Sequence, residues 1–156
     1  MFSQDFKEFI ESLNANKVRY LVVGGYAVAF HGHPRYTKDL DVWIENTPQN
    51  AARVIQALKQ FGFGSLDLSE KDFLAPDSIV QLGLPPNRVE LFTSLPGVEF
   101  KECFRKRAKT KIDGVATNFI DLLDFCDVIE KHRSVSRLAV LQARAIDLVQ
   151  FNALTS

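Results

Sequence analysis

Residues 22–45, VVGGYAVAFHGHPRYTKDLDVWIE, contain the pattern that decides the fold of this chain. A β-branched run ends in Gly24-Gly25, and the Ala-rich residues 26–31 that follow predict a short helix. Residues 39–45 then alternate and predict a second strand. A strand that runs into paired glycines and a helix start lets backbone N–H groups approach a phosphate closely. An ordinary strand-to-helix turn is the alternative interpretation, because glycine suits that turn as well.

Two carboxylates share one face of this second strand. Alternate side chains of a strand point the same way, so Asp39, Asp41 and Trp43 share a face and the apolar residues between them form the other. The apolar row predicts the core side and leaves the carboxylates on the opposite face. Adjacent carboxylates repel each other unless a cation or proton lies between them, and Mg²⁺ prefers oxygen ligands. The alternative is a solvated strand face, and for Trp43 a packing role is favoured over stacking on a base.

Residues 88–93 predict another strand, and it carries a third acidic residue. Val89 and Leu91 form its apolar face, whereas Arg88 and Glu90 share the other. A carboxylate on a strand beside the first two would complete a two-metal site. Taken alone, however, this segment favours an exposed Glu90 that pairs with Arg88 or another basic residue.

The remaining patterns predict helices around a modest sheet. Further helices are expected at residues 5–16, 48–61 with Thr47 as N-cap, 99–107, 120–131 and 134–151. A strand is expected at 78–82, and Asp113-Gly114 predicts a hairpin between 109–112 and 115–118. This order predicts one α+β domain over residues 1–156, with a mixed β-sheet flanked by helices rather than a doubly wound parallel sheet.

Together these motifs resemble the signature of the DNA polymerase beta-like nucleotidyltransferase superfamily. The matching motifs are Gly24-Gly25, a thirteen-residue spacer, Asp39-Leu40-Asp41 and Val89-Glu90-Leu91. Residues 82–102, LGLPPNRVELFTSLPGVEFKE, are also similar to small stand-alone bacterial members, among them relatives of aminoglycoside, lincosamide and toxin–antitoxin nucleotidyltransferases. The resemblance covers about residues 15–118 and implies a polymerase beta palm-like core, followed by C-terminal helices at about 120–151.

The resemblance implies a transferase that moves a nucleoside monophosphate from a nucleoside triphosphate, such as ATP, to a hydroxyl of an unidentified small-molecule, protein or RNA acceptor. It implies that Asp39, Asp41 and Glu90 are the catalytic acids and hold two Mg²⁺ ions, with Mn²⁺ as an alternative ion. The residues expected near the nucleotide phosphates are Gly24, Gly25, Arg35, Thr37 and Lys38, although a solvated-loop role is an equal alternative for Arg35 and Lys38.

Two other functions stay open at this point. One is a catalytically silent nucleotide-binding or toxin–antitoxin interaction protein of the same fold, and the other is a plain structural α+β domain. The short chain also predicts that a second copy or another protein supplies the part that binds the acceptor.

Composition narrows the class of protein. The 156 residues carry 19 Lys and Arg against 19 Asp and Glu, and this balance argues against a protein that coats a polyanion by bulk attraction. Residues 99–111 carry six basic against two acidic residues, so a nucleic acid such as a tRNA end is an alternative partner, but a solvated helix face is favoured. Free, reduced Cys103 and Cys126, the absence of a signal-like start and the lack of a long apolar run predict a cytoplasmic protein with no membrane segment.

Overall fold

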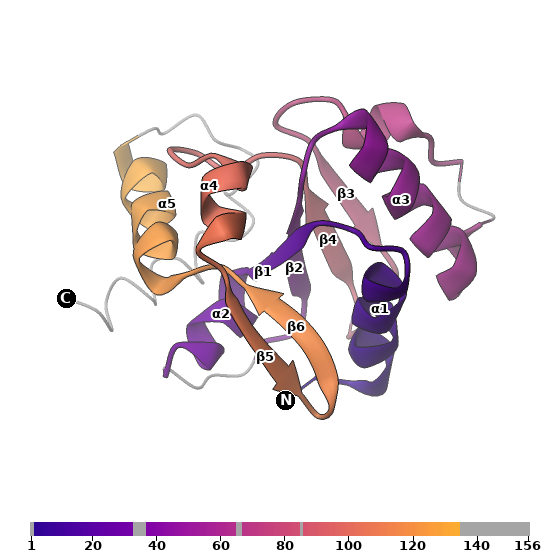
Figure 1. Cartoon of the computed structure of the whole chain (residues 1–156), viewed down its shortest axis with the longest axis horizontal. Coiled ribbons are helices and arrows are strands. Elements are labelled where there is room, and N and C mark those ends of the chain that lie inside the picture. Colours follow the sequence, from indigo (N-terminus) through magenta and orange to yellow (C-terminus); the bar gives the residue numbers. More distant parts are fainter. Residues whose placement is uncertain (1, 33–36, 65–66, 85, 135–156) are drawn as a thin grey trace.

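The computed structural model describes residues 2–32, 37–64, 67–84 and 86–134, which form six strands in one sheet (Figure 1). The strands are β1 (Tyr20–Val23), β2 (Leu40–Ile44), β3 (Ile79–Leu82), β4 (Val89–Phe92), β5 (Ala108–Ile112) and β6 (Val115–Phe119), and their order is β3-β4-β2-β1-β6-β5. β1 pairs antiparallel with β2 but parallel with β6, and β2 pairs parallel with β4. The predicted mixed sheet is therefore confirmed.

Helices cover the sheet on both sides. They are α1 (Gln4–Ala15), α2 (Gly24–Phe30), α3 (Pro48–Leu58), α4 (Phe100–Arg105) and α5 (Leu122–Ser134), with a π-helical turn at Lys59–Phe63 and a 3-10 turn at Glu70–Phe73. In Figure 1, α1 and α3 lie on one side of the sheet and α4 and α5 on the other. The predicted helix at 48–61 covers α3 and the first part of the π-helical turn, whereas the 3-10 turn was not predicted. Apart from Ser134, which ends α5, the predicted helix at 134–151 lies outside the described residues.

Local signals set several of the element boundaries. The Thr47 side chain accepts a hydrogen bond from the Asn50 N–H and Pro48 opens α3, as the sequence predicted. Asp113 and Gly114 both have positive φ, 51° and 84°, which is the conformation of a tight hairpin turn. α2 begins at Gly24, two residues earlier than predicted.

The alternative of a solvated strand face for residues 39–45 is wrong. All five residues of β2 are buried, because β2 lies between β4 and β1 and helices cover both sides of the sheet (Figure 1). On the face that carries the acidic residues, Trp43 packs edge-on against Phe100 of α4, with 5.1 Å between ring centroids. The packing role for Trp43 is therefore confirmed, and the sheet is a buried middle layer at this point.

Two further expectations concern the cysteines and the membrane. Cys103 and Cys126 are both free, and burial raises the pKa of the Cys103 thiol to about 12. Within the described residues, none of the helices has both the length and the apolar character needed to cross a bilayer.

Asn50 provides the first test of the packing. Its buried side chain accepts a hydrogen bond from the Arg19 N–H (2.8 Å) and donates to the carbonyls of Arg19 (3.1 Å) and Glu45 (2.9 Å), so it ties α3 to β1 and β2. We expect Asn50→Ala to lower the free energy of unfolding by about 2–3 kcal/mol, because buried backbone groups lose their partners. Urea denaturation measures this change. Gln49→Ala, at the exposed neighbour, is the control, and equal losses in both variants would contradict the role of Asn50.

Candidate active site

The pairing of β2 with β4 brings the predicted acidic residues together. The two strands run parallel, with Asp41 as the Cα partner of Glu90, and neighbouring strands lie about 4.8 Å apart. Because side chains alternate along a strand, Asp39 and Arg88 share the face of Asp41 and Glu90 at the preceding step. The sequence predicted that the third carboxylate would lie on a strand beside the first two, and this placement is confirmed; the catalytic roles stay predictions.

All three carboxylates are removed from solvent. Asp39 is 4% exposed, and Asp41 and Glu90 are each 1% exposed. The segment around Glu90, taken alone, favoured an exposed side chain, and that interpretation is therefore wrong. Burial penalises a charged group unless a cation or hydrogen bonds compensate it, so this cluster needs positive charge close by.

Arg88 supplies positive charge to the cluster. Its Nη2 donates to Asp39 Oδ2 at 2.9 Å and its Nε to the same oxygen at 3.3 Å. The Nε atom also lies 3.6 Å from Glu90 Oε1, which accepts a hydrogen bond from Gln81 Nε2 at 3.3 Å. The sequence suggested Arg88 only as a partner of Glu90. Its shorter contact, with Asp39, depends on the register of β2 against β4, which a single segment does not reveal.

The paired glycines lie directly against this cluster. Gly24 has φ +67°, and a Cβ at this position would overlap the Asp41 carboxylate. A Cβ at Gly25 would lie 2.7 Å from Thr37 Oγ1, and Thr37 Oγ1 in turn donates to the Asp39 carbonyl at 3.4 Å. The glycines thus allow the β1–α2 turn to approach two side chains, whereas the sequence pattern suggested only an approach to phosphate.

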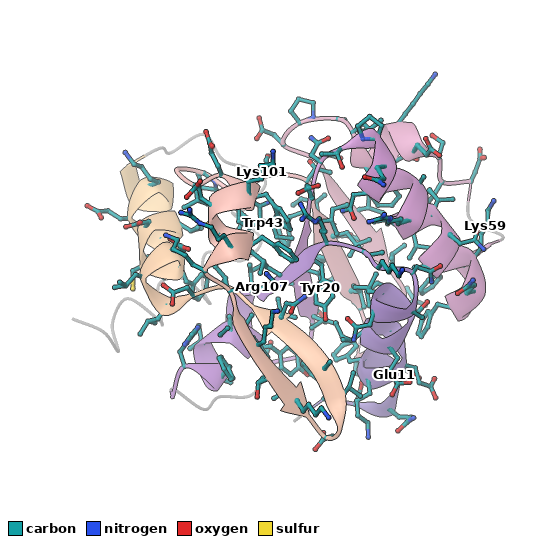
Figure 2. All side chains as sticks on the ribbon, in the orientation of Figure 1. Glu11, Tyr20, Trp43, Lys59, Lys101 and Arg107 are labelled. Atoms are coloured by element: carbon teal, nitrogen blue, oxygen red, sulfur yellow. The ribbon has the colours of Figure 1, made fainter. Side chains whose placement is uncertain are left out.

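Of the other two residues predicted near phosphate, only Lys38 belongs to the part of the chain that the structure describes. Lys38 is exposed and precedes Asp39 in the chain, and Arg35 lies outside the described residues. The structure therefore brings together Asp39, Asp41 and Glu90 with Gly24 and, through Gly25, Thr37. Figure 2 shows the side chains of the described residues in the same orientation as Figure 1.

Carboxylate oxygens are the donor type that Mg²⁺ prefers, so Asp41 and Glu90 fit such an ion in their chemistry. The absence of a Cβ at Gly24 also leaves room for the Asp41 carboxylate beside the β1–α2 turn. As the described side chains stand, no group of three or more His, Cys, Asp or Glu residues is arranged to hold a metal ion. The Arg88 guanidinium contacts Asp39 and lies near Glu90, so it occupies carboxylate oxygens that a metal ion would need.

Three of the six basic residues in segment 99–111 contact other side chains of the chain. Arg105 pairs with Glu102 (2.6 Å), Lys106 pairs with the buried Asp124 (2.8 Å), and Arg107 stacks on the Phe104 ring at 3.8 Å. Lys101, Lys109 and Lys111 are exposed. These contacts favour a helix face that packs against its own domain over a dedicated surface for nucleic acid.

Two pockets lie away from the acidic residues. One of about 690 Å³ lies between α1, the π-helical turn and the β3–β4 connection, and its lining includes Phe61 and Leu84. Another of about 530 Å³ lies between α4 and α5, around Glu102 and Asp124. Neither lining contains Asp39, Asp41 or Glu90.

Comparison with solved structures identifies the fold. A crystal structure from Thermotoga maritima, described as that of a "putative nucleotidyltransferase", matches with a TM-score of 0.62 and 14% sequence identity over 88% of each chain. This chain has the nucleotidyltransferase fold. No family model matches the sequence, and no curated protein matches it. At this identity the likeness shows the fold alone.

Gly24 provides a test of the site geometry. We expect Gly24→Ala to lower the free energy of unfolding by about 2 kcal/mol more than Gly114→Ala. Both changes place a Cβ at positive φ, which costs about 1–2 kcal/mol, but only the one at Gly24 also meets the Asp41 carboxylate, and nothing lies within 4 Å of a Cβ at Gly114. Urea denaturation of the two variants checks this, and equal losses would show that Gly24 is needed for its backbone conformation only.

Proposed function

We propose that this chain is a nucleotidyltransferase, which moves a nucleoside monophosphate from a nucleoside triphosphate to a hydroxyl group of an acceptor with the help of Mg²⁺. The observation that carries the proposal is the in-register pair of Asp41 and Glu90 on adjacent parallel strands, beside the Gly24-Gly25 turn, within a nucleotidyltransferase fold. Asp39, on the same face as these two carboxylates, completes the proposed set of ligands, and Mn²⁺ is the alternative ion.

Each residue of the site has a separate role in the proposed reaction. When bound, Mg²⁺ would stabilise the charge that develops on the transferred phosphoryl group. Glu90 would orient the acceptor hydroxyl and receive its proton as the hydroxyl oxygen bonds to the α-phosphorus and pyrophosphate leaves. Backbone N–H groups at Gly24 and Gly25 would hold the leaving phosphates, and Lys38 would add positive charge from its exposed position. Arg35 and Thr37 are proposed as further phosphate contacts.

A catalytically silent nucleotide-binding or interaction protein of the same fold is the second candidate. The observation that favours it is the Arg88 guanidinium, because it already compensates charge on Asp39 and lies near Glu90. Such a protein would act through a nucleotide or a protein partner, such as a second copy of the chain, and would transfer nothing.

Nucleotide binding tests the proposed site. With Mg²⁺ and one of ATP, CTP, GTP or UTP at about 100 times its Kd, we expect the Tm to rise by about 5–10 °C, because a ligand of the native state stabilises it by mass action. Asp41→Asn and Glu90→Gln should each abolish the shift. Glu45→Gln should keep it, since Glu45 pairs with Arg19 at the other end of β2. Thermal unfolding checks this, and an unchanged shift in Asp41→Asn would refute the assigned site.

Transfer itself separates the two candidate functions. A nucleotide labelled at its α-phosphate is incubated with the protein, Mg²⁺ and a cell extract, and label in an acceptor is measured together with pyrophosphate release. The enzyme should label an acceptor, and Asp41→Asn should not. A thermal shift without any transfer would support the catalytically silent candidate.

A further inference from the structure

Arg88 has no role in the reaction as proposed, yet its position is well defined. It directly precedes β4, and its carbonyl accepts a hydrogen bond from the Leu40 N–H at 3.0 Å, so the backbone of Arg88 is anchored to the start of β2. From this anchor the guanidinium reaches Asp39 Oδ2 through two N–H groups and lies 3.6 Å from Glu90 Oε1. The acids are thus bridged by a cation that belongs to the chain.

The exposure of the partners is unequal. The side chain of Arg88 is 33% exposed, whereas those of Asp39 and Glu90 are 5% and 1% exposed. The carboxylates are therefore held within the sheet, and the guanidinium lies at the boundary with solvent. Charge-assisted contacts of this type are strong, but a partly exposed arginine can leave them without opening the core.

A divalent cation and a guanidinium bind the same oxygen atoms of these carboxylates. Both need the oxygen lone pairs of Asp39 and Glu90, and two positive charges at one small cluster repel each other. A guanidinium satisfies a buried carboxylate while no metal is present, because a carboxylate pair without any compensating cation would be destabilising.

We propose that Arg88 is a resident counter-ion of the acidic cluster, which competes with the divalent cation for Asp39 and Glu90 and must leave them before the cation binds fully. This inference rests on the proposed function, because it concerns the metal assigned to that site. Arg88 then stabilises the metal-free protein and lowers the apparent affinity for metal. A purely structural ion pair has the opposite signature, since its removal would loosen the carboxylates and weaken metal binding.

Metal titration in the absence of nucleotide tests the competition. Mn²⁺ alone is titrated by calorimetry into the wild-type chain, Arg88→Gln, Arg88→Lys, Asp41→Asn and the control Arg19→Gln, at about pH 8, where carboxyl groups ordinarily are ionised. Arg19 is a matched control because it forms a 3.0 Å ion pair with Glu45, which follows the far end of β2. We expect Arg88→Gln to bind Mn²⁺ about tenfold more tightly than the wild-type chain, and Arg19→Gln to bind it equally.

A thermal measurement supplies the second readout. Without metal, Arg88→Gln should have a lower Tm than the wild-type chain, and Mn²⁺ should raise its Tm by more. If Arg88→Gln fails to fold, Arg88→Lys tests the competition instead. Lysine keeps the positive charge but cannot donate the two guanidinium hydrogen bonds to Asp39. This variant should also bind Mn²⁺ more tightly than the wild-type chain.

The outcomes separate this inference from the function on which it rests. Equal or weaker Mn²⁺ binding by the Arg88 variants, with binding still abolished in Asp41→Asn, would overturn the competition and leave the metal site intact. Binding in none of the proteins, or binding unaffected by Asp41→Asn, would overturn both the metal site and the inference.

Discussion

The parallel register of β2 against β4 places Asp41 opposite Glu90, and the arrangement of the site depends on this pairing. A slip of one residue would turn one of the two carboxylates to the opposite face of the sheet, among apolar side chains. The same register sets Trp43 beside Phe92 and leaves Arg88 within reach of Asp39. Pairing of the backbone thus determines which charges meet, and the two strands contribute the acidic residues and their counter-ion together.

Because the three carboxylates are buried as well as adjacent, their charges must be compensated locally. Three nearly inaccessible carboxylates repel one another, so the folded chain requires positive charge at the cluster. Arg88 provides it from within the chain, and a divalent cation would provide it in the proposed reaction. The zero net charge of the chain conceals this requirement, because the balance that matters is local. Stability and the proposed activity are therefore linked through the same oxygen atoms.

The remaining architecture holds the cluster in place. α4 covers Trp43 through Phe100, so β2 is buried on the face that carries the acids as well as on the other. At the opposite end of that face the chain turns sharply through Gly24, whose missing side chain admits the Asp41 carboxylate. A buried central sheet with one close backbone turn would suit the proposed site, in which a polyphosphate and a cation would be held in a defined geometry.

The sequence by itself determined the features that depend on neighbours along the chain. Alternation predicted the strands that carry the acidic residues, Thr47 and Pro48 marked the start of α3, and Asp113-Gly114 marked the hairpin, because each signal lies within a few residues. The motif resemblance likewise predicted the fold that the comparison with a solved structure supports.

Only the tertiary structure decided how the acidic residues are surrounded. Burial of their face depends on Phe100, 57 positions after Trp43 (100 − 43), and the contact between Arg88 and Asp39 spans 49 positions. The close approach of Gly24 to Asp41 likewise depends on how β1 pairs with β2. Alternation within one strand distinguishes its two faces, but it does not show what another part of the chain places on them. The physical reason is that burial and ion pairing are properties of packed neighbours, and these neighbours are distant in sequence.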